Sequence, residues 1–320
     1  MAGRLEGKVA IVTGAGRGIG RGEALLLAKE GCRVIVNDFG GDRAGEGDAV
    51  ECLGREIVEV GAEIKKMGGD AAAYDGNVAN VADGEAMVKQ ALDTFGRLDV
   101  LVNNAGILRD RMVFNMTEAE WDAVIAVHLK GQFTVTRFAS MVFRQQRSGA
   151  IVNTSSESGL GNMGQANYSA AKEGITGLTR TLALDLGRYG ARANAIRPRA
   201  ATRLTMSPEM EEARKKRQAA AAAGTPVREV ADGDQAIAHI DQLAPELVAP
   251  LVVFLCTDKA SNINGRDFIV GGNEISLMSQ PQRERTIYRE GGWDMDSLDR
   301  VFASTLRAGA KNPQPPQAPM

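Results

Sequence analysis

The chain has 320 residues, of which 44% are hydrophobic and 24% charged, as is usual for a globular protein with a buried core. Its net charge of −2 gives no indication of nucleic-acid binding, and no apolar run is long enough to span a membrane. Cys32, Cys52 and Cys256 lack metal-site spacing, and only two histidines are present. We therefore expect reduced thiols in a cytoplasmic protein, with no metal site, no disulfide framework and no Ser-His-Asp hydrolase site.

Strand-like and helix-like segments alternate along the chain as far as residue 270. Short apolar runs predict seven buried strands, at 8–13, 33–37, 71–74, 99–103, 150–154, 193–196 and 267–270. Helical spacing of apolar residues predicts helices at 18–30, 50–67, 84–95, 118–147, 167–186 and 245–256. Strand, helix and strand repeated at this pace indicate βαβ units, so we predict an α/β fold with a parallel sheet.

Two segments interrupt this alternation. The first, 39–48, is a glycine-rich loop after the second strand, and the second, 207–243, is a long, charged and alanine-rich insertion after the sixth strand. We expect one domain over 1–280, with 207–243 as a lid over the substrate end of the cleft. Residues 281–320 form a C-terminal extension, and the four prolines within 309–320 predict a disordered end.

A glycine loop, Gly14 to Gly20, lies between the first strand and the first helix. Glycines there let the backbone turn tightly and approach a pyrophosphate at the helix N-terminus, although a turn without a ligand is the alternative. Asp38 ends the second strand, where a carboxylate accepts hydrogen bonds from a ribose and repels a 2′-phosphate. Asp38 therefore favours NAD over NADP, whereas Arg17 would argue the other way.

Tyr168 and Lys172 are four residues apart, which places both side chains on one face of a helix. A neighbouring cation favours the phenolate, so Tyr168 is a candidate proton donor or acceptor for an alcohol/ketone pair. Exposed helices also carry such pairs without any function, so the context matters. Ser155 and Ser156 end the fifth strand just upstream, and the small residues of 103–106, after the fourth strand, leave room for a cofactor or form only a turn.

In this order the motifs resemble the short-chain dehydrogenase/reductase family. The matches are TGAGRGIG at 13–20, Asp38, Asn77-Val78, NNAG at 103–106, the serine after the fifth strand, and YSAAK at 168–172. They span residues 5 to about 206, and the end of the sheet near 245–272 also matches. The resemblance implies a Rossmann-type, doubly wound sheet of seven parallel strands with flanking helices. It also implies NAD(P) as the cofactor, of which Asp38 favours NAD, and we expect a homodimer or homotetramer.

The resemblance further implies roles for particular residues. Tyr168 is the catalytic acid/base, Lys172 lowers its pKa and holds the nicotinamide ribose, and Ser156 hydrogen-bonds the substrate oxygen. Ser155 and Ser158 are alternatives to Ser156, because this loop is one residue shorter than is common in the family. The implied cofactor-binding residues are Gly14, Arg17, Gly18, Ile19, Gly20, Asp38, Asn77, Val78, Asn104, Ala105, Gly106, Tyr168, Lys172 and Pro198.

His128 occupies the position where many family members have an asparagine that takes part in a proton relay. It either shares that role or is a half-buried histidine whose hydrogen bonds are satisfied within the fold.

Longer matches at 37–42, 104–111, 127–131, 164–172 and 245–251 are similar to one group within the family. This group comprises the (3R)-hydroxyacyl-CoA dehydrogenase domains of peroxisomal multifunctional enzymes, also called 17β-hydroxysteroid dehydrogenase type 4, and their free-standing bacterial relatives. The resemblance implies NAD-dependent oxidation of a fatty or steroid side-chain 3-hydroxyacyl-CoA in β-oxidation. The alternatives are a 17β-hydroxysteroid dehydrogenase that acts on free steroids and a catalytically silent nucleotide-binding scaffold.

Overall fold

The computed structural model describes residues 3–41, 44, 45, 49–202, 243–309 and 313. The lid predicted at 207–243 and the disordered end predicted at 309–320 therefore lie almost entirely outside the described residues. The chain divides into two compact units, Met1–Met278 and Ser279–Met320. That 1–280 is an independent domain stays a prediction.

An eight-stranded sheet with the order β3-β2-β1-β4-β5-β6-β7-β8 forms the centre of the first unit. The strands are β1 (Val9–Thr13), β2 (Arg33–Asp38), β3 (Asp70–Asp75), β4 (Val100–Asn103), β5 (Gly149–Thr154), β6 (Ala191–Pro198), β7 (Asp267–Gly271) and β8 (Glu274–Leu277). Strands β1 to β7 pair in parallel, as predicted, and β8 adds an antiparallel edge strand next to β7. Because the order reverses between β1 and β4, a ligand cleft is expected at the carboxyl ends of these two strands.

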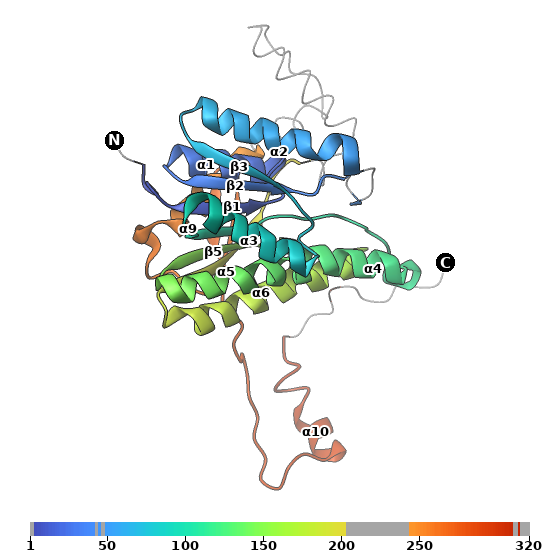
Figure 1. Ribbon diagram of the computed structural model, residues 1–320. Coiled ribbons are helices and arrows are strands. Elements are labelled where there is room, and N and C mark those ends of the chain that lie inside the picture. Colours follow the sequence, from blue (N-terminus) through green and yellow to red (C-terminus); the bar gives the residue numbers. More distant parts are fainter. Residues whose placement is uncertain (1–2, 42–43, 46–48, 203–242, 310–312, 314–320) are drawn as a thin grey trace, which may run out of the picture. The chain divides into compact units, whose positions relative to one another are not determined.

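Helices cover both faces of this sheet (Figure 1). They are α1 (Gly18–Lys29), α2 (Ala49–Lys66) and α9 (Ala249–Cys256) on one face, and α3 (Val81–Phe95), α5 (Gly131–Gln146) and α6 (Ala166–Gly187) on the other. Short 3₁₀ turns lie at η1 (Val113–Asn115), η3 (Glu157–Leu160), η4 (Pro245–Leu247) and η5 (Asp258–Ala260). Among the described residues, no helix is both long and apolar enough to cross a membrane.

The single long helix predicted at 118–147 is wrong in one respect. The structure has α4 (Glu118–Ile125), a π-helical segment η2 (Ala126–Lys130) and then α5. A π-helical turn contains an extra residue, and such turns are frequent at functional sites. The pattern of apolar residues does not reveal it, because the helix axis continues through the wide turn.

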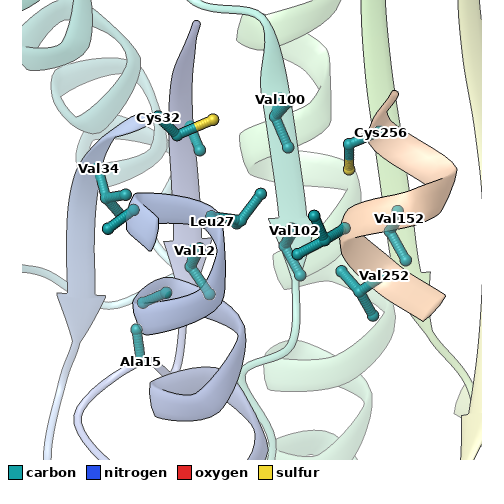
Figure 2. Close-up of a cluster of buried hydrophobic side chains, with 14 of the residues drawn as sticks. Val12, Ala15, Leu27, Cys32, Val34, Val100, Val102, Val152, Val252 and Cys256 are labelled. Carbon is teal, nitrogen blue, oxygen red and sulfur yellow. The ribbon is translucent and has the colours of Figure 1, made fainter. Parts of the chain in front are cut away.

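Each face of the sheet buries its own layer of apolar side chains. Figure 2 shows valines of four neighbouring strands facing Leu27 of α1 and Val252 of α9: Val12, Val34, Val102 and Val152. Ile11, Leu101 and Ile151 point to the opposite face, under α3, α5 and α6. Burial on both faces explains why these strands are continuous apolar runs rather than alternating ones.

The second unit contains the helix α10 (Met295–Val301) among its described residues. The Asp294 carboxylate accepts a hydrogen bond from the Ser297 backbone N–H at 2.7 Å and so caps this helix. Arg285 donates to the carbonyls of Thr305 and Ala308. The sequence predicts no element here, because a helix of two turns leaves too short a pattern to recognise.

Glu23 of α1 is an ionisable residue buried in the core. Its side chain is fully buried, and neither carboxyl oxygen has a hydrogen-bond partner among the described residues. Burial raises the pKa of Glu23 to about 8, and burial also raises the pKa of the nearby Cys256 thiol to about 12. Both groups are therefore mainly uncharged at neutral pH.

We predict that Glu23→Gln changes how stability depends on pH. In the unfolded chain Glu23 ionises near 4.5, whereas in the folded protein it ionises near 8, so wild-type stability falls as the pH rises between these values. The loss is on the order of 4 kcal/mol, and a glutamine does not incur it. Urea unfolding at pH 5 and pH 8.5 should show the variant gaining stability relative to wild type at the higher pH. An equal stability difference at both pH values would contradict this.

Candidate active site

A cavity of about 770 Å³ opens where β1, β2, β3 and β4 end. Most of the residues predicted to bind the cofactor line this cavity: Gly14, Arg17, Gly18, Ile19, Asp38, Asn77, Val78, Asn104, Ala105 and Gly106. Gly20, Pro198, Tyr168 and Lys172 do not belong to its lining. The carboxyl edge of the sheet thus brings together side chains from four separate strand ends.

The glycine loop has the backbone shape that its sequence indicates. Gly14 and Gly18 have φ of 64° and 58°, a conformation that favours glycine. A Cβ on Gly14 would lie 2.7 Å from the Ala105 Cα, so the loop approaches the end of β4 too closely for a side chain. Gly20 has a packing role instead, because a Cβ there would lie 2.3 Å from the Gly14 carbonyl oxygen.

The asparagine pair that ends β4 fixes this edge of the sheet. Asn104 Nδ2 donates to the carbonyls of Thr13 and Gly14 at 3.0 and 3.1 Å, and Thr13 Oγ1 accepts from the Asn104 N–H at 3.0 Å. Asn103 Nδ2 donates to Asn153 Oδ1 of β5 at 2.9 Å. The two amides therefore tie β4 to the strands on either side of it.

Asp38 presents its carboxylate at the far end of the cavity. Its two oxygens accept hydrogen bonds from the backbone N–H groups of Gly16 and Gly40, at 3.0 and 2.9 Å. These bonds hold the carboxylate in one orientation, while each oxygen keeps a further acceptor site.

Two of the three arginines that line the cavity, Arg17 and Arg21, are held by carboxylates of α2. Arg17 Nε lies 3.3 Å from Glu56 Oε2, and the same guanidinium donates to the Gly41 carbonyl at 2.7 Å. Arg21 pairs with Glu63 at 2.5 Å. These ion pairs reduce the positive charge that a 2′-phosphate would require at this end of the cavity.

Asn77 and Val78 follow β3 and form one wall of the cavity. Asn77 is held by its backbone N–H, which donates to Asp83 at 2.8 Å, and by its side-chain oxygen, which accepts from the Ala79 N–H at 2.9 Å. Val78 is buried, and Gly131 has no room for a Cβ beside it.

The three predicted catalytic residues lie on two neighbouring elements after β5. Ser156 begins η3, whereas Tyr168 and Lys172 belong to α6. Lys172 Nζ donates to the Thr154 carbonyl at 2.7 Å and lies 5.3 Å from the centre of the Tyr168 ring. Lys172 is buried and Tyr168 is partly buried.

Burial dominates the ionisation of this pair. It raises the pKa of Tyr168 to about 12, although a hydrogen bond from Ser156 acts to lower it. Burial lowers the pKa of Lys172 to about 7. So buried an amine is only partly protonated at neutral pH, and its role in lowering the pKa of Tyr168 stays a prediction.

The local hydrogen bonds favour Ser156 over the two alternative serines. The buried Ser155 hydroxyl donates to the Lys172 carbonyl at 2.8 Å. Ser158 Oγ lies 3.4 Å from the Asn162 side-chain amide on the exposed side of the loop. Ser156 Oγ accepts from the Ser158 N–H at 3.1 Å, which leaves its own proton available to a substrate oxygen or to Tyr168.

His128 lies in the π-helical turn and contacts both the cavity wall and the catalytic helix. Its Nε2 is 2.8 Å from the Ile107 carbonyl oxygen, and its ring meets the Tyr168 ring edge-on with centroids 5.0 Å apart. Burial, with a smaller effect of Lys172, holds the pKa of His128 well below 6.5. His128 is therefore neutral, and a Cβ on Gly106 would lie 2.4 Å from its ring.

Comparison with known proteins identifies the family. A family model described as short chain dehydrogenase matches residues 8–215. The chain belongs to this family. It is 42% identical to the hydroxyacyl-CoA dehydrogenase ChsB1 of Mycobacterium tuberculosis, over 95% of this chain and 88% of that protein.

Two further relatives support the assignment to the short-chain dehydrogenases. Identity to the peroxisomal multifunctional enzyme type 2 of Mus musculus is 42% over 89% of this chain, which spans only 34% of that protein. The crystal structure of a short chain dehydrogenase from Mycobacterium avium is similar with a TM-score of 0.77 and 40% identity, over 98% of this chain and 99% of that chain. The protein is thus an oxidoreductase of a family that uses nicotinamide cofactors.

The residues of this short-chain dehydrogenase fit such a cofactor. The volume of the cavity is within the range of small-molecule sites. Its glycine loop leads into the N-terminus of α1, and Asp38 lies at one end of the cavity. In this arrangement the loop would hold the pyrophosphate, Asp38 the adenosine ribose, and Lys172 the nicotinamide ribose.

Two residues with roles at the site were not selected from the sequence. Thr13 ends β1 and hydrogen-bonds the N–H groups of Asn104 and Ala105. Arg197 is buried at the end of β6 beside the Ser156 loop. No local signal singles out Arg197, because β6 also contains Arg192 and Asn194. Pro198, which is predicted to bind the cofactor, is the last residue of the same strand and does not line the cavity.

We predict that Tyr168→Phe lowers turnover about 10²- to 10⁴-fold while the Kd for the nucleotide changes less than about threefold. The phenol supplies the proton transfer, and its ring packing is kept. Ser156→Ala should also lower turnover, whereas Ser155→Ala should mainly lower Tm, since Ser155 bonds the backbone of α6. Steady-state kinetics and nucleotide titration measure these effects. Tyr168→Phe turnover within a few-fold of wild type would refute the assignment.

Proposed function

We propose that this protein oxidises a 3-hydroxyacyl-CoA to the 3-oxoacyl-CoA, with NAD as the electron acceptor. The observation that carries the proposal is the 42% identity, along nearly the whole of both chains, to a relative named hydroxyacyl-CoA dehydrogenase. The juxtaposition of Ser156, Tyr168 and Lys172 supports it, because these groups suit proton transfer from a secondary alcohol. A fatty or a steroid side-chain acyl group fits the same chemistry.

In this proposal each residue has one task. NAD, when bound, supplies the hydride acceptor for the carbinol carbon. Ser156 donates a hydrogen bond to the substrate oxygen and orients it toward Tyr168. Tyr168, as phenolate, takes the hydroxyl proton. Lys172 reaches the same region from the next turn of α6 and, when protonated, favours that phenolate.

Asp38 is the basis for choosing NAD over NADP. Its carboxylate is fixed by two backbone N–H groups, and the neighbouring arginines are paired with glutamates. A 2′-phosphate would be repelled by this oriented negative charge in a partly desolvated site, whereas ribose hydroxyls would donate hydrogen bonds to the carboxylate. Assembly into a homodimer or homotetramer and a cytoplasmic location stay predictions from the sequence.

We predict that kcat/KM for NAD exceeds that for NADP by about tenfold or more, and that Asp38→Ala reduces this ratio by about tenfold. Asp75→Ala is the matched control, since Asp75 is the exposed residue next to Asp38 on β3. The control should keep the wild-type ratio. A preference for NADP that Asp38→Ala leaves unchanged would overturn the choice of cofactor.

The substrate is tested by NADH formation with four alcohols at matched concentrations. These are a medium-chain 3-hydroxyacyl-CoA, a steroid side-chain 3-hydroxyacyl-CoA, a free 17-hydroxysteroid and a simple secondary alcohol. We expect kcat/KM for one of the two thioesters to exceed that for the free steroid by about 100-fold. The reason is that binding energy from parts of the substrate remote from the reacting carbon can be used to stabilise the transition state. Preference for the free steroid would identify a hydroxysteroid dehydrogenase, and no NADH from any alcohol would indicate a silent scaffold.

A further inference from the structure

Arg197 is a charged side chain buried at the carboxyl end of β6. Only 2% of it is exposed, and it lies next to the last residue of β6, at the edge of the sheet that carries the active site. Removing a guanidinium from water is costly, and well-packed apolar residues often stabilise a core as well as buried ion pairs do. A buried arginine at this position therefore depends on the hydrogen-bond partners around it.

The guanidinium of Arg197 donates to three acceptors from three different elements. Nη1 donates to the Ser156 carbonyl at 2.7 Å, Nη2 to Glu173 Oε2 at 2.8 Å, and Nε to Asp267 Oδ2 at 2.6 Å. Ser156 lies in the loop after β5, Glu173 is the residue after Lys172 on α6, and Asp267 begins β7. One rigid, planar group thus joins both elements that carry catalytic residues to the sheet.

The surrounding backbone leaves little room for this group to move. A Cβ on Gly159 would lie 3.0 Å from Arg197 Nη1 and from Glu173 Oε2, so the η3 loop passes directly over the ion pair. Two residues further along, Arg199 binds Glu157 with both Nε and Nη2, at 2.5 and 2.7 Å. Arg197 and Arg199 therefore hold Ser156 and the residue that follows it, Glu157.

We propose that Arg197 is a positioning residue that sets the Ser156 hydroxyl against the Tyr168 phenol by holding the Ser156 loop and α6 to one guanidinium. The proposal rests on the function proposed above, in which Ser156 and Tyr168 act on one oxygen atom. A displacement of about 1 Å between two such groups can cost on the order of 100-fold in rate. Arg197 touches neither substrate nor cofactor in this arrangement, so its effect is transmitted through Ser156.

The test compares Arg197→Met with Arg192→Met. Arg192 is an arginine at the opposite end of the same strand, and it donates to the carbonyls of Leu255 and Thr257 without reaching the Ser156 loop. Both changes remove buried hydrogen bonds and should lower Tm. We expect Arg197→Met alone to lower kcat, by about 10- to 100-fold, with the Kd for NAD within about threefold of wild type. Equal kcat losses in both variants, or none in Arg197→Met, would overturn the proposal.

A second readout needs no substrate. In protein labelled with ¹³C at tyrosine Cζ, Tyr168 is one of four tyrosines, and its NMR signal is assigned by its loss in Tyr168→Phe. Ser156→Ala defines how the signal moves when the hydrogen bond from Ser156 is lost. We expect Arg197→Met to move it in the same direction by at least half as much, and Arg192→Met to leave it in place. An unmoved signal in Arg197→Met would contradict the proposal.

This readout also separates the two proposals. If wild type oxidises no 3-hydroxyacyl-CoA, the proposed function fails, and the Tyr168 signal still decides whether Arg197 positions Ser156. If Arg197→Met does not fold, Arg197→Lys is used instead. Lysine keeps the positive charge but lacks the planar guanidinium that reaches three acceptors. The Tyr168 signal of Arg197→Lys should then move toward that of Ser156→Ala, and a wild-type signal would refute the proposal.

Discussion

The site depends on a line of buried amide hydrogen bonds along the carboxyl edge of the sheet. Asn103 Nδ2 donates to Asn153 Oδ1 and to Thr136 Oγ1, both at 2.9 Å, and Asn153 Nδ2 donates to Thr179 Oγ1 at 2.9 Å. These bonds fix the ends of β4 and β5 against α5 and α6, while Asn104 fixes β4 against the glycine loop. Buried amides without partners would be costly, so this network specifies one arrangement of the strand ends.

Two regions of different character meet at this edge. The lining of the cavity beyond β1 to β4 includes several glycines and alanines, where a nucleotide can approach the backbone closely. The region beyond β5 and β6 instead contains buried ionisable groups, among them Lys172, His128 and Arg197. Burial keeps His128 neutral and Lys172 only partly protonated, whereas two carboxylates accept hydrogen bonds from Arg197. In the proposed function, the nucleotide therefore binds at one part of the carboxyl edge of the sheet and proton transfer occurs at another.

The sequence predicted the parallel sheet and its order of elements well, because strands buried on both faces are unbroken apolar runs between helical patterns. It missed the antiparallel strand β8, which is short and has Ile275 and Leu277 exposed. It also missed the π-helical turn, since no residue pattern marks it. At the site, local motifs predicted the cavity residues, but the raised pKa of Tyr168 and the contacts of Arg197 depend on burial and on distant segments, which a local pattern does not contain.

In the proposed mechanism the cavity and the Ser156–Tyr168 pair form one site, with the nucleotide on one side and the reacting alcohol on the other. The most direct measurement is a crystal structure of Tyr168→Phe with NAD and a 3-hydroxyacyl-CoA, because this variant should retain both ligands unreacted. We expect the adenosine ribose at Asp38 and the carbinol oxygen about 2.6–3.2 Å from Ser156 Oγ. A carbinol oxygen bound away from Ser156, or a nucleotide outside the cavity, would contradict this mechanism.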